Sequence, residues 1–272
     1  MPALVVRLCV ALAALPLLAV DPTFLRRDTS SIATGADGYK AIFGAGDKDA
    51  RVMRGVTRYG ELTLPAGVAH TKSYSQEELV YVVLDGTGHV STAAGEAAIK
   101  RLDFFYVSPA TTHTLNAATP LRLLVMGFRA TAVSSTGKLP LANIDDVRPQ
   151  TVGGHPPSTQ YRLLLGTTNS QRDRLACSQN IASLFVMEFA PGGTNIPHHH
   201  ETEEEIYYVL EGEGQMVAGG GLEGLEGKFP SRAGDAWFFR LNTTVGFYAG
   251  PRSRILAVRS RFPFARPPGE KQ

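Results

Sequence analysis

Short apolar runs separated by turn-forming residues dominate the chain from about residue 40 to residue 262. The runs are rich in β-branched and aromatic residues, and Gly, Pro, Asp and Asn stand between them. Outside the first twenty residues no apolar period of 3.6 residues is sustained, so long amphipathic helices are not expected. Strands at this spacing predict an all-β fold of the sandwich or barrel type.

The same pattern occurs twice. The segment EELVYVVLDGTGHV (77–90) matches EEIYYVLEGEGQMV (204–217), and LDFFYVSPATTHTLN (102–116) matches GDAWFFRLNTTVGFY (234–248). Two more matches keep this order, pairing 59–68 with 184–193 and 121–130 with 253–262. Four ordered matches indicate a duplication of one structural unit.

The duplication predicts two domains in tandem. We expect the N-terminal domain at 21–130 and the C-terminal domain at 161–262. Residues 131–160 are polar and rich in Pro and Gly, which is typical of a linker, and 263–272 form a tail.

The first twenty residues have a different character. One early charge, Arg7, precedes an uncharged run that is too short to span a bilayer and resembles the core of a secretory signal peptide. We therefore expect a signal peptide at 1–20, a secreted or periplasmic protein and no stable membrane anchor; a buried N-terminal helix is the alternative. Removal of this leader would take Cys9 with it and leave Cys177, which we expect to be a buried structural cysteine.

Composition narrows the range of partners. Of the 272 residues 43% are hydrophobic and 19% charged, which suits a globular protein with an apolar core. A formal net charge of +2 gives no electrostatic basis for binding nucleic acid. We expect a small-molecule partner instead.

The chemistry of the chain is concentrated in the stretch PGGTNIPHHHETEEEIYYVLEGEG (191–214). In an extended segment His198 and His200 share one face, and Glu205 begins the strand that follows. Two imidazoles and one carboxylate form a common ligand set for one divalent metal ion, here Fe, Mn or Zn. The alternative is a solvated polar edge, which is what we expect of Glu201, Glu203 and Glu204.

These residues carry a family resemblance. The order Gly192, His198, His200, Glu205, Gly212 resembles the first motif of the cupin superfamily, and AGDAWFF (233–239) resembles the start of its second. The resemblance covers roughly residues 40–262 and implies a bicupin with two tandem jelly-roll β-barrels. It also makes a homodimer plausible. The architecture is similar to ureidoglycine aminohydrolase-type bicupins, although their substrate does not carry over because the ligand pattern differs.

The chain departs from the family pattern at the fourth ligand. The histidine that ends the second motif is replaced by Val245, and the nearest substitutes, Asn242 and Tyr248, are out of register. Val245 and Phe247 share a face of a regular strand, so we expect them to make the pocket beside the metal apolar.

The first repeat departs in the opposite way. Lys72, Tyr74 and Leu79 stand where the second repeat has its three ligands, while the second-motif histidine is kept as His113. We therefore expect a first domain without metal, in which His113 is hydrogen-bonded or lines the interior.

Three functions remain open at this point: a metal-dependent enzyme, a non-catalytic protein that captures a sugar, an organic acid or the metal, and a storage protein. We favour an enzyme, with dioxygenase-like oxidation ahead of hydrolysis or isomerisation. Tyr207 is a candidate acid or hydrogen-bond donor, or only a packing residue, and Arg240 binds a substrate carboxylate or points to solvent. We expect two histidines and four arginines to lie on the surface: His89, His155, Arg252, Arg254, Arg259 and Arg261.

Overall fold

The computed structural model describes residues 21–130, 138–220 and 226–261 of the chain. The expected signal peptide and tail lie outside the described residues, as do residues 131–137 of the expected linker. Strands and three short 3-10 helices make up the secondary structure of the described part. None of its helices is both long enough and apolar enough to cross a membrane.

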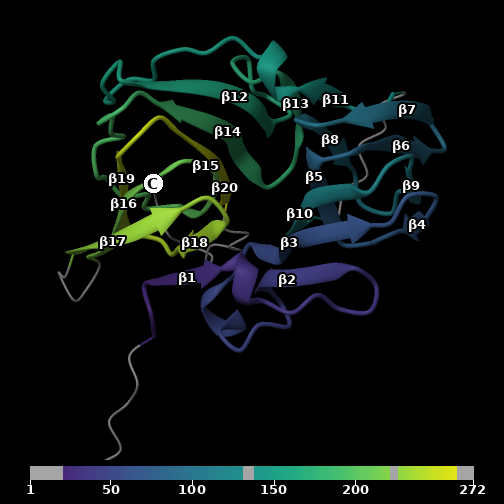
Figure 1. The fold of residues 1–272 in the computed structure, drawn as a ribbon, viewed down its shortest axis with the longest axis horizontal. Helices are drawn as coiled ribbons and strands as arrows, with labels where there is room; N and C mark the ends of the chain where they lie inside the picture. The colour runs from purple at the N-terminus through teal and green to yellow at the C-terminus, as the bar shows by residue number, and fades with distance from the viewer. Residues whose placement is uncertain (1–20, 131–137, 221–225, 262–272) are drawn as a thin grey trace, which may run out of the picture.

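Strands follow one another along both halves of the chain (Figure 1). The first half contains β1 (Phe24–Asp28), β2 (Tyr39–Gly44), β3 (Val56–Leu64), β4 (Ala69–Lys72), β5 (Glu77–Asp85), β6 (Thr87–Thr92), β7 (Gly95–Lys100), β8 (Asp103–Val107), β9 (His113–Ala117) and β10 (Leu121–Arg129). The second contains β11 (Leu141–Asn143), β12 (Thr159–Thr167), β13 (Leu175–Ser178), β14 (Ile181–Phe189), β15 (Glu203–Glu211), β16 (Glu213–Gly220), β17 (Glu226–Arg232), β18 (Asp235–Phe239), β19 (Thr243–Ala249) and β20 (Ser253–Arg261).

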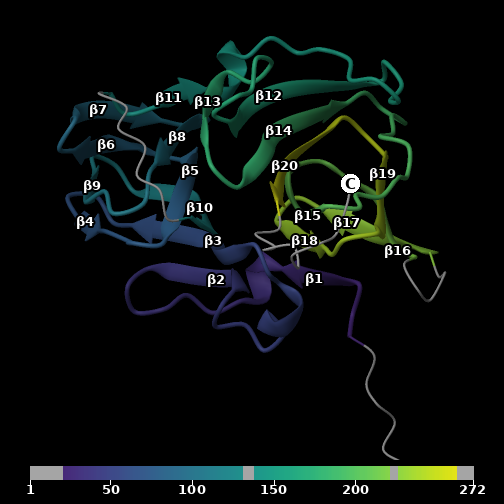
Figure 2. The same ribbon diagram turned by 180° about the vertical axis from the view of Figure 1, so that it is seen from behind.

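These strands form four sheets, two in each half. The first half has a six-stranded sheet (β11-β8-β5-β10-β3-β2) and a four-stranded sheet (β4-β9-β6-β7). The second half has a seven-stranded sheet (β1-β18-β15-β20-β14-β12-β13) and a three-stranded sheet (β17-β16-β19). Each half is a jelly roll with an apolar interior, and both views show the halves side by side (Figures 1 and 2). The predicted all-β fold of two tandem jelly rolls is confirmed; the sheets keep open edges and do not close into complete barrels.

The two large sheets also pack against each other, which explains the nearly continuous apolar runs. On β5, Tyr81 and Val83 face the interior of the first jelly roll, whereas Val80 and Val82 face a core shared by both halves. A strand with both faces buried has no solvent-facing positions to alternate with apolar ones. The shared core joins the halves into one compact body.

The strands that precede the two jelly rolls are exchanged between them. β1 pairs with β18 of the second half, in the register Asp28 to Asp235. β11 pairs with β8 of the first half, in the register Asn143 to Asp103. The exchange departs from the boundaries expected from the sequence, since β1 of the expected N-terminal domain completes a sheet of the second half and β11 of the expected linker completes a sheet of the first.

Two buried glutamates make matching contacts across the halves. Glu78 of β5 accepts hydrogen bonds from the backbone N–H groups of Gln179 (2.8 Å), Asn180 (2.8 Å) and Ile181 (3.1 Å). Glu204 of β15 accepts from the N–H groups of Arg54 (3.0 Å) and Gly55 (2.8 Å) in the first half. The expectation of a solvated Glu204 is wrong, because this side chain is 3% exposed and serves the interface.

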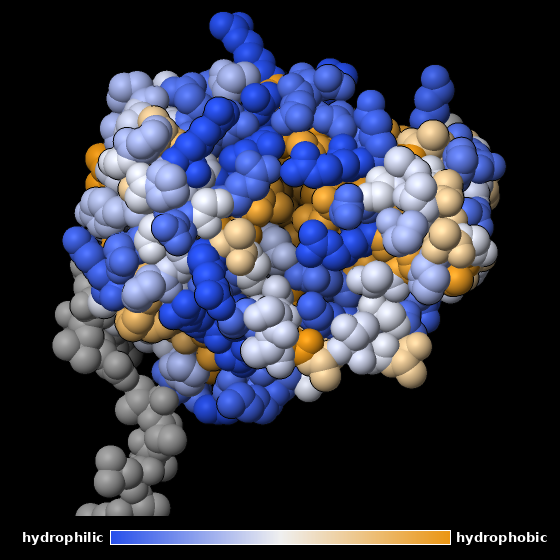
Figure 3. All heavy atoms as spheres, in the orientation of Figure 1, coloured by the Kyte–Doolittle hydropathy of each residue, from blue (hydrophilic) through white to orange (hydrophobic). Residues whose placement is uncertain are grey.

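The outer surface is predominantly polar. Hydrophilic residues cover most of the face shown in Figure 3, and apolar residues occur in small groups and in hollows. Among the described residues the exposed large apolar side chains are Val68 and Ile196. Scattered apolar residues of this kind are normal on a globular protein.

Candidate metal centre

His198, His200 and Glu205 come together at one end of the second jelly roll. The histidines lie between β14 and β15, and Glu205 lies near the start of β15. His198 exchanges backbone hydrogen bonds with Val245 of β19 (3.0 and 2.8 Å), and the carbonyl of His200 accepts one from Asn242 (2.8 Å). One potential donor atom of each of the three side chains lies within 4.8 Å of the others. The residues therefore converge as their spacing predicts.

Three buried polar atoms of this triad lack hydrogen-bond partners in the protein. Glu205 is 2% exposed, and neither of its carboxylate oxygens has a hydrogen bond. His200 Nε2 is also buried without a hydrogen bond, although it lies 3.3 Å from Glu205 Oε2. A buried carboxylate without donors is costly, and a cation held between these atoms would supply the missing partner. The residues present thus fit a divalent metal ion.

A backbone hydrogen bond fixes the tautomer of His198 that can bind a metal. Its Nδ1 lies 2.9 Å from the carbonyl oxygen of Ile196, which can only accept a hydrogen bond. The proton therefore sits on Nδ1, and Nε2 keeps its lone pair. Burial is the main cause that lowers the pKa of His198, while Glu205 acts to raise it. The neutral ring favoured in this way is the form that binds a metal.

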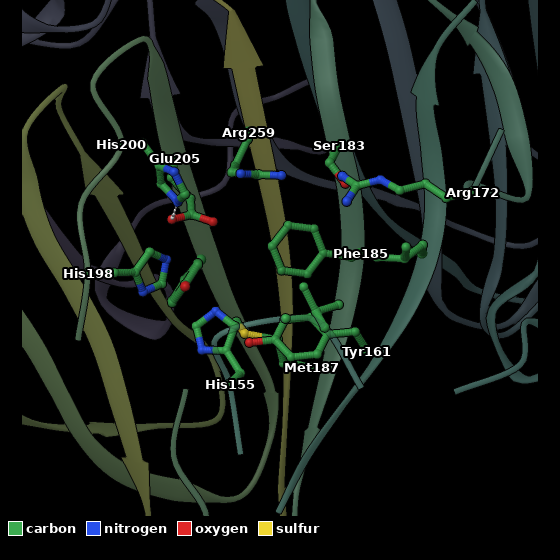
Figure 4. A pocket seen from close by; sticks show the side chains of 14 residues that line it. His155, Tyr161, Arg172, Ser183, Phe185, Met187, His198, His200, Glu205 and Arg259 are labelled. Atoms are coloured by element: carbon green, nitrogen blue, oxygen red, sulfur yellow. Dashed lines mark ion pairs between the residues drawn. The ribbon is translucent and has the colours of Figure 1, made fainter. Parts of the chain in front are cut away.

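A cavity of about 260 Å³ opens beside the triad (Figure 4). Leu163 of β12 and Phe185 and Met187 of β14 give it an apolar wall. Polar side chains from several elements line the rest, and many of them have buried atoms without hydrogen-bond partners. These unpartnered atoms belong to Glu205, His200, His155, Tyr161, Ser183 and Arg259.

His155 reaches this cavity from the segment expected to be a linker. Its ring lies edge-on to that of His198, with the two centroids 5.0 Å apart. The distance from its centroid to that of the Tyr161 ring is 5.4 Å. Nδ1 is buried without a hydrogen bond, and burial is the main cause that lowers the pKa of the imidazole. The expectation of a surface residue is wrong. No motif signals this role, since only the folding of the linker over the mouth of the jelly roll brings His155 here.

The arginines are distributed differently from what was expected. Arg259 of β20 lines the cavity, and Arg254 is 9% exposed with Asp145 at 3.1 Å and Glu188 at 3.3 Å, so outward positions for these two are wrong. Arg240 does not line the cavity, and its Nη1 donates to the carbonyl of Pro22 at 3.4 Å.

Tyr207 of β15 is a buried residue beside the triad. The side chain lines the cavity, is 1% exposed and packs edge-on against Phe239. Its hydroxyl oxygen accepts a hydrogen bond from Asn195 Nδ2 at 3.0 Å, while Asn195 Oδ1 accepts from the N–H of Phe247 at 2.6 Å. Burial raises the pKa of Tyr207 well above its ordinary value. The hydroxyl therefore stays protonated and keeps its own hydrogen for donation.

The residues around the missing fourth ligand do not replace it. Val245 and Phe247 are buried among the interior apolar side chains and do not line the cavity, so the expected apolar wall from these two is wrong. Asn242 is exposed, and the ring of Tyr248 lies under Lys228 Nζ at 4.5 Å.

The first repeat uses the equivalent positions for packing. Lys72 pairs with His113 across β4 and β9, as His198 pairs with Val245. His113 is 1% exposed, and its Nε2 lies 2.6 Å from the hydroxyl of Tyr81. The histidine is thus one of the buried hydrogen-bonded residues of this jelly roll.

The double jelly roll and the His-x-His…Glu set have the arrangement of a bicupin, and the second half contains a cupin domain. The family model described as the cupin domain matches residues 185–248, which include the triad. No curated protein matches the chain.

Solved structures are similar over most of the chain. The oxalate decarboxylase of Lactobacillus farciminis in complex with formate is 15% identical, with a TM-score of 0.67 over 88% of this chain and 86% of that one. Protein Ylba from E. coli is 15% identical, with a TM-score of 0.65 over 90% and 94%. The Bacillus subtilis oxalate decarboxylase, a protein with Mn(II) centres, is 12% identical, with a TM-score of 0.64 over 87% and 76%. Identities this low support the shared fold and not a shared reaction.

Proposed function

We propose that the second jelly roll is the active site of a metal-dependent enzyme that acts on a small organic molecule. His198, His200 and Glu205 would hold one divalent metal ion. The observation that carries the proposal is the convergence of three ligand side chains, with unpartnered buried atoms, beside a cavity of about 260 Å³. A cavity of this size suits a small ligand and excludes a macromolecule.

The donor set limits the choice of metal. Two imidazoles and one carboxylate suit Fe, Mn or Zn, and a solved structure of similar fold contains Mn(II) centres. When bound, such an ion supplies Lewis acidity or a binding position for O₂. Three protein ligands leave open positions, which supports O₂-dependent oxidation first and hydrolysis or isomerisation next.

His155 favours catalysis over simple capture. An imidazole that is not part of the triad, with an unpartnered nitrogen in the same cavity, is placed to accept or return a proton of the ligand. Tyr207, which also lines the cavity, would donate a hydrogen bond to the bound molecule. The apolar wall of Leu163, Phe185 and Met187 would exclude water from the bound molecule. A binding protein needs no such proton acceptor, although capture without chemistry remains the alternative function.

The sequence also supports a proposed location. The apolar run before Asp21 leads us to propose export through a cleaved signal peptide. The exported form would begin near β1, the strand that completes the sheet containing Glu205.

Elemental mass spectrometry tests the metal. The full chain without its leader and without a histidine tag is compared with His198→Ala/His200→Ala and with His199→Ala, a control at an exposed position between the two ligands. We expect about one equivalent of Fe, Mn or Zn in the wild type and the control, and none in the double variant. Failure of the wild type to hold metal after reconstitution contradicts the proposal.

Catalysis is tested on the loaded protein. Oxygen consumption and product formation are measured for a panel of small organic acids, sugars and amides, with His155→Gln beside the wild type. Turnover that falls in this variant at unchanged metal content supports an enzyme. Ligand binding without turnover by either protein supports capture.

A further inference from the structure

We infer that the cavity holds an anion-binding subsite, formed by Arg259, Ser183 and Arg172, that selects a small organic acid. This inference names the substrate class of the proposed site and so rests on the proposed function for the metal end of the ligand. The subsite lies next to the triad and is separate from its ligand atoms.

The three sheet residues involved stand in one row across three strands. Ser183 of β14 is the cross-strand partner of Arg259 of β20, and Arg259 is that of Glu205 of β15. Cross-strand neighbours on one face lie close enough for their side chains to share a ligand. The metal end and the anion end of the cavity are therefore adjacent positions of one rigid sheet.

Arg259 has N–H groups that are available to donate hydrogen bonds to a ligand. Its Nη1 bonds Glu203 Oε2 at 3.2 Å, its Nε is buried without a hydrogen bond, and its guanidinium lies 5.7 Å from the ring of Phe185. Figure 4 shows the guanidinium directed away from Glu205 and toward Ser183. The planar guanidinium carries five N–H donors and matches a carboxylate with two parallel hydrogen bonds. One surface carboxylate thus leaves part of this group available to the cavity.

Ser183 supplies the second observation. It is 0% exposed, and its Oγ is buried without a partner while it lines the cavity. A serine that only filled space would be replaced by alanine at no loss of packing, whereas a buried hydroxyl without a hydrogen bond is unfavourable. A ligand oxygen at this position would accept a hydrogen bond from the hydroxyl.

Arg172 completes the subsite from the mouth of the cavity. It belongs to the segment between β12 and β13, its side chain is 51% exposed, and it lines the same cavity as Ser183. The charged residues lining the cavity are then two arginines and one carboxylate, Glu205. Each arginine also has a carboxylate partner, Asp173 at 3.7 Å from Arg172 and Glu203 at 3.2 Å from Arg259, so these five side chains sum to one negative charge, and a divalent cation at the triad would make the site net positive by one. Such a site favours an anion over a neutral sugar or amide.

The position of the subsite specifies the ligand further. A molecule that spans the cavity carries a carboxylate for Arg259 and a second oxygen function for the metal. Small dicarboxylic, hydroxy and oxo acids have both groups within a few bonds. Arg240, the carboxylate partner considered from the sequence, has no part in this arrangement because it does not line the cavity.

Calorimetric titration of the metal-loaded chain tests the inference. The probes are oxalate, malonate, succinate and 2-oxoglutarate, with malonamide as the neutral match of malonate. We expect at least one acid to bind and malonamide not to bind. Arg259→Gln should weaken that acid about 10- to 100-fold and Ser183→Ala about 3- to 10-fold, as loss of a charged and a neutral hydrogen bond predicts.

Three controls make the outcome decisive. Arg259→Lys keeps the charge and should recover part of the affinity, which also guards against a folding defect. Arg261→Gln, an exposed position on the same strand, should bind like the wild type. Metal content is measured for every variant and should not change.

The possible results separate this inference from the proposed function. Acid binding that is unaffected by Arg259→Gln and Ser183→Ala, or no binding by any of the four acids, overturns the subsite even if the metal is present. Acid binding that depends on Arg259 in a chain without metal supports the subsite while contradicting the proposed metal centre.

Discussion

Replacing Glu205 by glutamine should have opposite effects on stability in the metal-free and metal-loaded protein. In the metal-free protein Glu205 is 2% exposed and neither carboxylate oxygen has a hydrogen bond. An uncompensated buried charge costs about 3–5 kcal/mol, and an unpaired amide about 1–3 kcal/mol. The difference predicts that Glu205→Gln stabilises the metal-free protein by about 2 kcal/mol.

Bound metal should make the wild type more stable than Glu205→Gln. An ion present at about 1,000 times its Kd adds about 4.1 kcal/mol to the native state. Loss of the carboxylate removes most of that gain, so the loaded variant should fall about 2 kcal/mol below the loaded wild type. Unfolding entropy near 2.1 cal/mol/K per residue converts each 2 kcal/mol to about 3–4 °C in Tm for a chain of this length.

Thermal unfolding followed by circular dichroism provides the assay, with one sample treated with chelator and one reconstituted with metal. Glu201→Gln, an exposed position in the same segment, serves as the control and should leave both Tm values unchanged. A variant that is less stable than the wild type without metal would show that the carboxylate has a structural partner. The physical basis for a metal at this position would then be refuted.

Three further predictions concern other buried groups. Glu78→Ala removes the acceptor of the Gln179 and Asn180 N–H groups and of the Tyr106 and Ser178 hydroxyls, and it should lower the free energy of unfolding in urea by at least about 3 kcal/mol, whereas a change below about 1 kcal/mol would contradict the interface contact. Burial lowers the pKa of His113 below its ordinary value, so the unfolded chain binds a proton at higher pH than the folded chain does, and stability should decline as the pH falls below about 6.5. His113→Gln should reduce the loss of stability measured between pH 7 and pH 5. An unchanged loss of stability would contradict this cause. Burial raises the pKa of the Cys177 thiol to about 12, so a disulfide reagent at pH 8 should label it only after unfolding, and rapid labelling of the native protein lacking its leader would contradict the burial.

The local pattern of the sequence determined much of this protein. Short apolar runs and turn residues indicated the strands, and the ordered matches between 77–90 and 204–217 indicated two copies of one unit. The approach of His198, His200 and Glu205 was also predictable, because all three lie within eight residues of chain in which the period of an extended backbone sets the side-chain directions.

Only the tertiary structure decided what surrounds the triad. His155, Ser183 and Arg259 lie far from one another in the sequence and meet because β14, β20 and β15 are neighbours in the sheet while the linker folds over its end. Glu204 shows the same limit: its acidic neighbours indicate a solvated loop, yet the packing of two large sheets places it in the interface. Strand order and sheet packing arise from contacts between distant segments, and no local periodicity carries that information.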